Sequence, residues 1–141
     1  MLKTILVALD GSELSERVIE SLKELQIQPA TKIILSHVIP SSESEVEIAV
    51  DRPQTSSEDL PYRQIEKQLQ SYQVDLSCDS ELEIVTGDPA EEIIRLANIY
   101  QVDLIVIGSR GLTGLQRILE GSVSSQVVTD APCSVLVVKP G

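Results

Sequence analysis

Short apolar runs and amphipathic stretches follow one another along the whole chain. Five of the runs are rich in Ile, Leu and Val and have the length of buried strands. They occupy residues 3–9, 31–39, 82–86, 103–107 and 134–138. Strands separated by helical stretches predict an α/β fold with a parallel sheet and helices on both faces, because right-handed crossovers leave few other topologies.

Between these runs, apolar residues recur every three or four positions, which is the period of an amphipathic helix. The first such stretch begins near Leu14 and is expected to end at Pro29. A second helix of roughly 15 residues should begin at about Asp59. The third begins at Pro89, and the fourth covers 122–129.

Polar residues mark the starts of two of these helices. Asp10-Gly-Ser has the composition of a strand end, a turn and a helix N-cap. Asp88 is a second predicted N-cap, with Pro89 at the first helical position. Tyr62 and Tyr72 share the period of the second helix, which favours packing against the core over a stacking platform for bases.

Residues 41–58 have no clean period and carry acidic residues, several Ser and one Pro. They are predicted to form a surface loop, which is long enough to be a mobile lid or merely disordered. Because the stretch is acidic, it is also the segment that a protein partner would most readily use.

The chain of 141 residues fits one domain, since it contains no linker and no internal repeat. We therefore expect a single domain over 1–141. Phe and Trp are absent and Tyr occurs three times, so Ile, Leu and Val must build the core. A chain of this size needs no disulfide or metal for stability.

Charge and cysteine content exclude several classes of function. The net charge of −11 is spread along the chain, which argues against a surface for nucleic-acid phosphates. Cys78 and Cys133 have no CxxC partner and the chain has one His, so two idle thiols in a reducing compartment are expected. No apolar run approaches the roughly 20 residues that span a bilayer, and we expect a cytoplasmic protein.

The fourth strand leads into a glycine-rich segment, Gly108-Ser-Arg-Gly-Leu-Thr-Gly114, which continues to Gly121-Ser-Val-Ser124. Glycines let backbone N–H groups approach an anion closely. A helix that begins near Ser122 would point its free N–H groups into the same space, and the hydroxyls of Ser122 and Ser124 would add donors. The segment outlines a phosphate cradle, although glycines after a strand can also form a simple turn.

The spacing Gly108-x2-Gly111-x9-Gly121-Ser122 resembles the signature of the universal stress protein family, specifically its ATP-binding branch. The resemblance extends from residues 5–12 through His37-Val38 to 131–138. It implies a three-layer α/β/α fold of the adenine nucleotide alpha hydrolase type, with the five strands in the order 3-2-1-4-5. In that order the ends of the first and fourth strands meet at the point where the winding direction reverses.

The resemblance also implies a site for ATP, ADP or AMP. Asp10 would accept from a ribose hydroxyl or help to hold Mg²⁺ or Mn²⁺ on the phosphates, and its alternative role is to support a turn. Arg110 would lean over the phosphates or point to solvent. The other implied contacts are Ala8, Leu9, Val38 and Ile107 near the base and ribose, Gly108, Gly111, Gly121 and Ser122 at the phosphates, and Val123 and Ser124 at the terminal phosphates.

No catalytic residue is predicted. Neither G-x4-G-K-[ST] nor G-x-G-x-x-G after a strand occurs, and His37 at a strand end is more often packed or solvated than a base. The sequence therefore favours a nucleotide-binding switch with at most slow hydrolysis. The alternatives are a slow ATP hydrolase and an adaptor that uses the acidic 41–58 segment. A homodimer through the last strand, 135–138, is also expected if that strand lies at the sheet edge.

Overall fold

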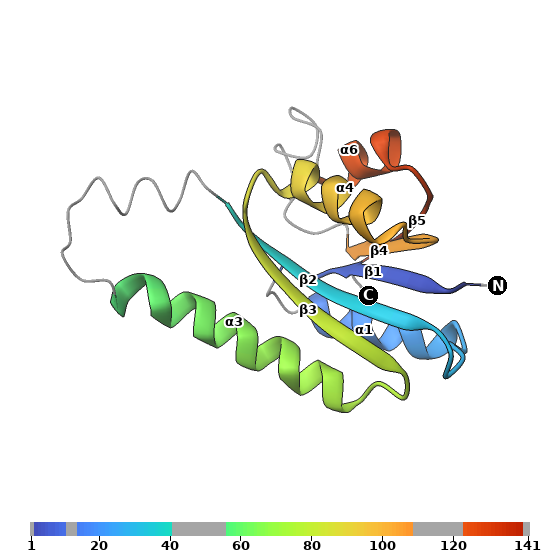
Figure 1. The fold of residues 1–141 in the computed structure, drawn as a ribbon, viewed down its shortest axis with the longest axis horizontal. Helices are drawn as coiled ribbons and strands as arrows, with labels where there is room; N and C mark the ends of the chain where they lie inside the picture. The colour runs from blue at the N-terminus through green and yellow to red at the C-terminus, as the bar shows by residue number, and fades with distance from the viewer. Residues whose placement is uncertain (1, 11–13, 41–55, 109–122, 140–141) are drawn as a thin grey trace.

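A computed structural model describes residues 2–10, 14–40, 56–108 and 123–139. In this part of the chain five parallel strands form one sheet in the order β3-β2-β1-β4-β5 (Figure 1). The predicted strand order is confirmed. The strands are β1 (Thr4–Ala8), β2 (Lys32–Pro40), β3 (Asp79–Gly87), β4 (Leu104–Gly108) and β5 (Ser134–Val138).

Helices cover both faces of the sheet, which gives the predicted three layers (Figure 1). The described helices are α1 (Leu14–Glu24), α3 (Ser56–Val74), α4 (Pro89–Tyr100) and α6 (Val123–Asp130). The helices α1 and α3 pack on one face, and α4 and α6 pack on the other. The strand alternation separates two cores, since Ile5 and Val7 of β1 contact the first helix pair and Leu6 contacts the second.

Two helix boundaries differ from the prediction. The helix α1 ends at Glu24 instead of Pro29, because Gln26 adopts a left-handed conformation with φ of 54° and turns the chain before the proline is reached. The helix α3 begins at Ser56 and runs for 19 residues, so the last three positions of the predicted 41–58 loop are helical. Residues 41–55 lie outside the described residues.

The strand β3 begins three residues earlier than predicted, at Asp79. Its pairing with β2 starts at Lys32 and Asp79 and continues for nine positions to Pro40 and Gly87. The first three residues of this strand are polar, so the apolar pattern did not predict them as part of it. The backbone ladder forms regardless, because one side of this strand is closed by β2.

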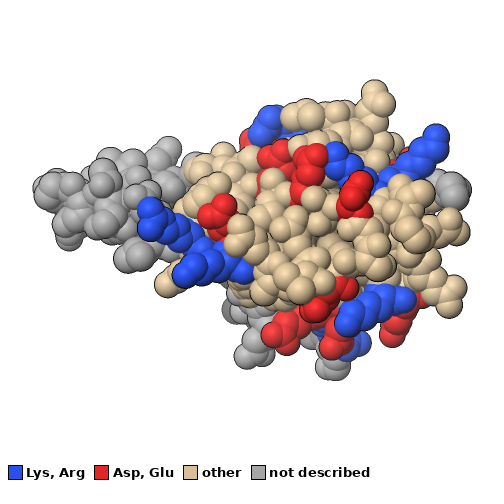
Figure 2. All heavy atoms as spheres, turned by 60° about the horizontal axis from the view of Figure 1, so that its bottom comes forward, with Lys and Arg blue, Asp and Glu red and all other residues tan. Residues whose placement is uncertain are grey.

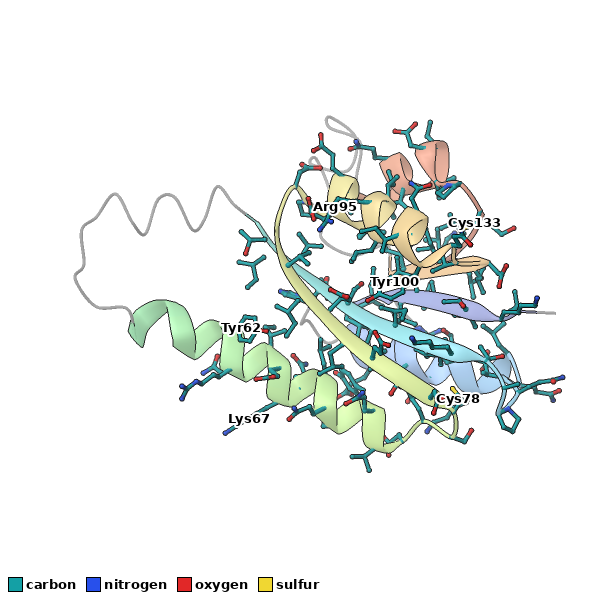
Figure 3. All side chains as sticks on the ribbon, in the orientation of Figure 1. Tyr62, Lys67, Cys78, Arg95, Tyr100 and Cys133 are labelled. Atoms are coloured by element: carbon teal, nitrogen blue, oxygen red, sulfur yellow. The ribbon has the colours of Figure 1, made fainter. Side chains whose placement is uncertain are left out.

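The polar start of β3 is matched by polar partners on its neighbours. The Lys32 ammonium lies 2.5 Å from Glu81. The Tyr100 hydroxyl, at the end of α4, donates to Glu83 and lies 3.3 Å from Glu81 (Figure 3). The hydrogen bond to Glu83 is the largest of several influences that raise the pKa of Tyr100. These contacts pair the polar side chains of β3 with Lys32 of β2 and Tyr100 of α4, so the cluster is explained by structural contacts alone.

Asp88 is the N-cap of α4, as predicted. Its side chain accepts a hydrogen bond from the Glu91 N–H at 3.0 Å, and Pro89 occupies the first turn.

The two tyrosines of α3 differ. Tyr72 packs against the first core, but Tyr62 is 42% exposed and its predicted packing role is wrong. Helical spacing defines a face of α3, and Ile65, Leu69 and Tyr72 on that face meet the core, whereas Tyr62 does not.

Both cysteines are free and half-buried, in separate turns before β3 and β5 (Figure 3). Burial raises the pKa of the Cys78 and Cys133 thiols, which agrees with the expectation of idle thiols. No cluster of three or more His, Cys, Asp or Glu residues that could hold a metal occurs within the described ranges. None of the helices described above is long and apolar enough to cross a membrane.

Asp103 fastens the start of β1 to the start of β4. Its Oδ2 atom accepts from the Lys3 N–H at 2.8 Å and from the Thr4 N–H at 3.0 Å, and its own N–H donates to the Thr4 carbonyl at 2.8 Å. The hydrogen bonds from the Lys3 and Thr4 backbone lower the pKa of the Asp103 carboxyl. The ionised carboxylate therefore stabilises the folded state.

Replacing Asp103 with Asn should lower the free energy of unfolding at pH 7, and the deficit should vanish as the pH is lowered. The pKa of the Asp103 carboxyl is lower in the folded state than in the unfolded state. The stabilisation that this carboxylate contributes is therefore fully present above the unfolded pKa of about 4, and it is lost as the pH falls through the lower folded pKa. Urea unfolding of both proteins from pH 7 to about 3 measures the difference. Asp130→Asn, an exposed change on α6, is the control, and a deficit that persists at low pH would contradict the prediction.

Candidate functional site

The carboxyl ends of β2, β1 and β4 meet at one edge of the sheet. In the ladder, Ala8 pairs with Ser36 on one side and with Ile107 on the other. The strand order reverses at β1, because β2 lies on one side of it and β4 on the other. In open parallel sheets this reversal point is where ligands bind, beyond the strand ends. The fold thus brings Ala8, Leu9, Asp10, Ile107 and Gly108 to one place.

The predicted base-binding residues lie on two different faces of the sheet. Val38 and Ile107 belong to the core on the α4 and α6 face, and Ala8 packs against it. Leu9 belongs to the opposite core and is 4% exposed. The Leu9 N–H donates to the Ser36 carbonyl at 2.8 Å, and its own carbonyl lies 2.8 Å from the His37 ring. The side chain and backbone of Leu9 are therefore engaged within the protein.

Asp10 is exposed and follows directly on this edge. The Ser15 hydroxyl, in the first turn of α1, donates to the Asp10 Oδ1 atom at 3.4 Å. A carboxylate beside a helix N-terminus is favoured by the helix dipole. The contact supports the structural role of Asp10, and its exposure is compatible with a ligand role.

The negative charge of Asp10 contributes to the pKa of Tyr72 on α3. Burial raises the pKa of Tyr72 most, a hydrogen bond from Gln68 lowers it, and the charges of Glu16 and Asp10 raise it further. Two carboxylates, Asp10 and Glu16, therefore lie within electrostatic range of the Tyr72 hydroxyl.

Gly108 has a packing reason to be glycine. A Cβ atom added there would lie 2.6 Å from Cδ2 and 2.9 Å from Cγ of Leu14, the first residue of α1. The end of β4 and the start of α1 are in close contact because no side chain separates them. This explanation requires no ligand, and it stands beside the phosphate-binding role expected for Gly108.

The helix α6 begins at the same edge. It lies between the parallel strands β4 and β5 in the chain, so it must run back against them and start where they end (Figure 1). Val123 at its start is 37% exposed, and Ser124 is buried. Arg110, Gly111, Gly121 and Ser122 lie outside the described residues.

Figure 2 shows acidic and basic side chains interspersed on the face turned toward the reader. The described residues of that face form no continuous basic area.

The sequence pattern of the universal stress protein family matches residues 1–139. The universal stress protein Sll1388 of Synechocystis sp. is 33% identical over 96% of this chain and 96% of its own. This chain belongs to the universal stress protein family. The ATP-binding branch within the family is a narrower assignment and remains a prediction.

Solved structures of this family have the same fold. The protein MJ0577, which is a universal stress protein of Methanocaldococcus jannaschii, superposes with a TM-score of 0.72 at 34% identity, covering 99% of this chain and 96% of that one. A universal stress protein in complex with cAMP has a TM-score of 0.71 at 22% identity, with 98% and 97% covered. One from Archaeoglobus fulgidus in complex with dAMP has 0.68 at 21%, with 97% and 98% covered.

One contact at the site of this family member was not foreseen from the sequence. His37 is half-buried, in line with the expected packed residue, but the sequence did not predict that its ring would contact the Leu9 carbonyl next to Asp10. The only signal in the sequence was its position near the end of the second strand, adjacent to Val38. Its partner became visible only when the register of β1 on β2 was known.

Gly108→Ala should destabilise the protein by about 1–3 kcal/mol, the usual cost of overpacking a well-filled core. In a Leu14→Ala background the same change should cost much less, because the clashing atoms are gone. Urea unfolding of the four proteins in this cycle measures the coupling. An equal loss in both backgrounds would show that the contact with Leu14 is not the reason for the glycine.

Proposed function

We propose that this universal stress protein binds an adenine nucleotide at the carboxyl edge of β1, β2 and β4 and acts as a binding switch. The observation that carries the proposal is the convergence, at the reversal point of the sheet, of two strand ends with the start of α6. Relatives with this fold that are in complex with cAMP and dAMP support the class of ligand.

The two sides of the edge suit different parts of a nucleotide. On the α4 and α6 face, Ala8, Val38 and Ile107 would offer apolar contacts for a base; Ala8 is half-buried, and Val38 and Ile107 are 9% and 5% exposed. The start of α6 carries the positive end of the helix dipole, which favours an anion, so Val123 and Ser124 would face the phosphates. The family resemblance implies that Arg110, Gly111, Gly121 and Ser122, which lie outside the described residues, would belong to the same phosphate site.

Asp10 would contact the ribose or a divalent cation carried by the phosphates. A carboxylate is a suitable oxygen ligand for Mg²⁺ or Mn²⁺. One carboxylate is not a resident metal site, which fits a cation that arrives with the nucleotide. Asp10 would then contact the metal, and the helix start would accept the phosphates.

Efficient hydrolysis is not part of the proposal. The chain has a single histidine, and the Nδ1 atom of that residue is committed to the Leu9 carbonyl. The residues at the described edge supply binding and orientation, and slow ATP hydrolysis is the second candidate. The adaptor function rests on the 41–58 segment and stays a prediction, as does the cytoplasmic location.

We also infer one domain over 1–141 and a homodimer through β5. The family pattern spans 139 residues of the chain, which supports a single unit. The strand β5 closes one side of the sheet, and Val135, Leu136 and Val137 are only half-buried. An apolar strand at a sheet edge favours pairing with a copy of itself.

Calorimetric titration with ATP, ADP and AMP, each with and without Mg²⁺, tests the proposal. Asp10→Asn should weaken the preferred nucleotide about 10-fold, because a hydrogen bond to a charged group is lost. The matched control is Asp130→Asn at the far end of α6, which should bind as the unaltered protein does. Failure of the unaltered protein to bind any of the three would overturn the function.

A further inference from the structure

We propose that His37 is a positioning residue of the nucleotide site, which sets the orientation of the Leu9–Asp10 peptide and thereby the place of Asp10. The inference rests on the proposed function, because it assigns His37 a part in nucleotide binding. It is carried by the contact between the His37 Nδ1 atom and the Leu9 carbonyl oxygen at 2.8 Å.

The chemistry of this contact determines which nitrogen carries the proton. A carbonyl oxygen can only accept, so the Nδ1 atom must be the donor. In the neutral ring, Nε2 is then without a hydrogen, and the hydrogen bond holds the ring in this tautomer. The ring therefore acts as a fixed donor toward the backbone, and it keeps that role whether or not Nε2 is protonated.

The contact lies where β1 leaves the sheet. The ladder between β1 and β2 ends at Ala8 and Ser36. At this end the Ser36 hydroxyl donates to the Val7 carbonyl at 2.9 Å, and one residue beyond it the Leu9 N–H donates to the Ser36 carbonyl at 2.8 Å. The His37 ring adds the bond to the Leu9 carbonyl. Two consecutive residues of β2 thus hold β1 one residue past its last strand position.

Holding the Leu9 carbonyl oxygen also orients the amide of Asp10. The carbonyl of Leu9 and the N–H of Asp10 belong to one planar trans peptide unit and point in opposite directions. With the oxygen directed at His37, the Asp10 N–H must point away from the ring. The backbone of Asp10 is thereby oriented from β2, while the Ser15 hydroxyl contacts its side chain from α1.

The side-chain alternation of β2 makes His37 suited to this role. Ile33 and Leu35 face the α1 and α3 core, and Ile34 and Val38 face the α4 and α6 core. By this alternation His37 lies on the α1 face while its neighbour Val38 lines the predicted base pocket. One dipeptide of β2 would therefore serve both sides of the site, with an apolar contact from Val38 and a backbone anchor from His37.

Paired substitutions separate the donor from the bulk of the ring. His37→Asn can place an amide N–H close to the position of Nδ1, whereas His37→Leu fills similar space without a donor. We expect His37→Leu to weaken ATP binding about 10-fold and His37→Asn to stay within about 3-fold of the unaltered protein. In the Asp10→Asn background, His37→Leu should cost little more, because both changes act through the same residue.

The tautomer gives a readout that does not depend on nucleotide. The chain has one histidine, so ¹⁵N-histidine labelling gives the ring nitrogens of His37 alone in an NMR spectrum. We expect a protonated Nδ1 and an unprotonated Nε2 at a pH where the ring is neutral. The opposite tautomer would overturn the inference without any binding experiment.

The outcomes distinguish the two proposals. If the unaltered protein binds no adenine nucleotide, the proposed function fails, and the tautomer still tests the hydrogen bond. If it binds and His37→Leu binds equally well, the positioning role is wrong. Equal weakening in His37→Asn and His37→Leu would also overturn it, because the donor would then not matter. If His37→Leu does not fold, His37→Gln takes its place as the variant without a donor at the Nδ1 position, because the glutamine amide reaches past that position. Equal ATP binding by the Asn and Gln variants would then overturn the positioning role.

Discussion

The parallel pairing of β1 with β2 and β4 is the constraint on which the rest of the structure depends. All three central residues of β1, Ile5, Leu6 and Val7, are fully buried, and each helix layer packs on one side of them. Because side chains alternate along a strand, a shift of one residue in either ladder would exchange the two cores. The same register sets which strand ends become neighbours at the carboxyl edge.

The edge that results is built with unequal sides. On the α1 side it has charge, with Asp10 and Glu16 influencing the Tyr72 hydroxyl. On the α4 and α6 side it has apolar contacts and the start of a helix. The proposed ligand, with an apolar base, a polar ribose and an anionic tail, would use both sides of this edge. Leu9, which has a packing role, is adjacent to Asp10, for which we propose a binding role.

Glycine and histidine at this edge illustrate how packing and function overlap. Gly108 allows the end of β4 to approach Leu14 of α1, and it is also expected to approach a phosphate. His37 closes the end of the β1 ladder, and we infer that it also orients Asp10. At both residues, folding brings a backbone segment into close contact with a neighbouring side chain. Nucleotide binding would use the same backbone positions.

The sequence by itself determined the alternation of strands and helices, the N-cap at Asp88, and the positions of Gly108 at a strand end and Asp10 just past one. These follow from local properties: apolar period, turn chemistry and residue type. The tertiary structure decided where β3 starts, where α1 stops, that Tyr62 is exposed, and that His37 meets Leu9. Each of these depends on pairing or packing between segments distant in the chain, and no local pattern carries that information.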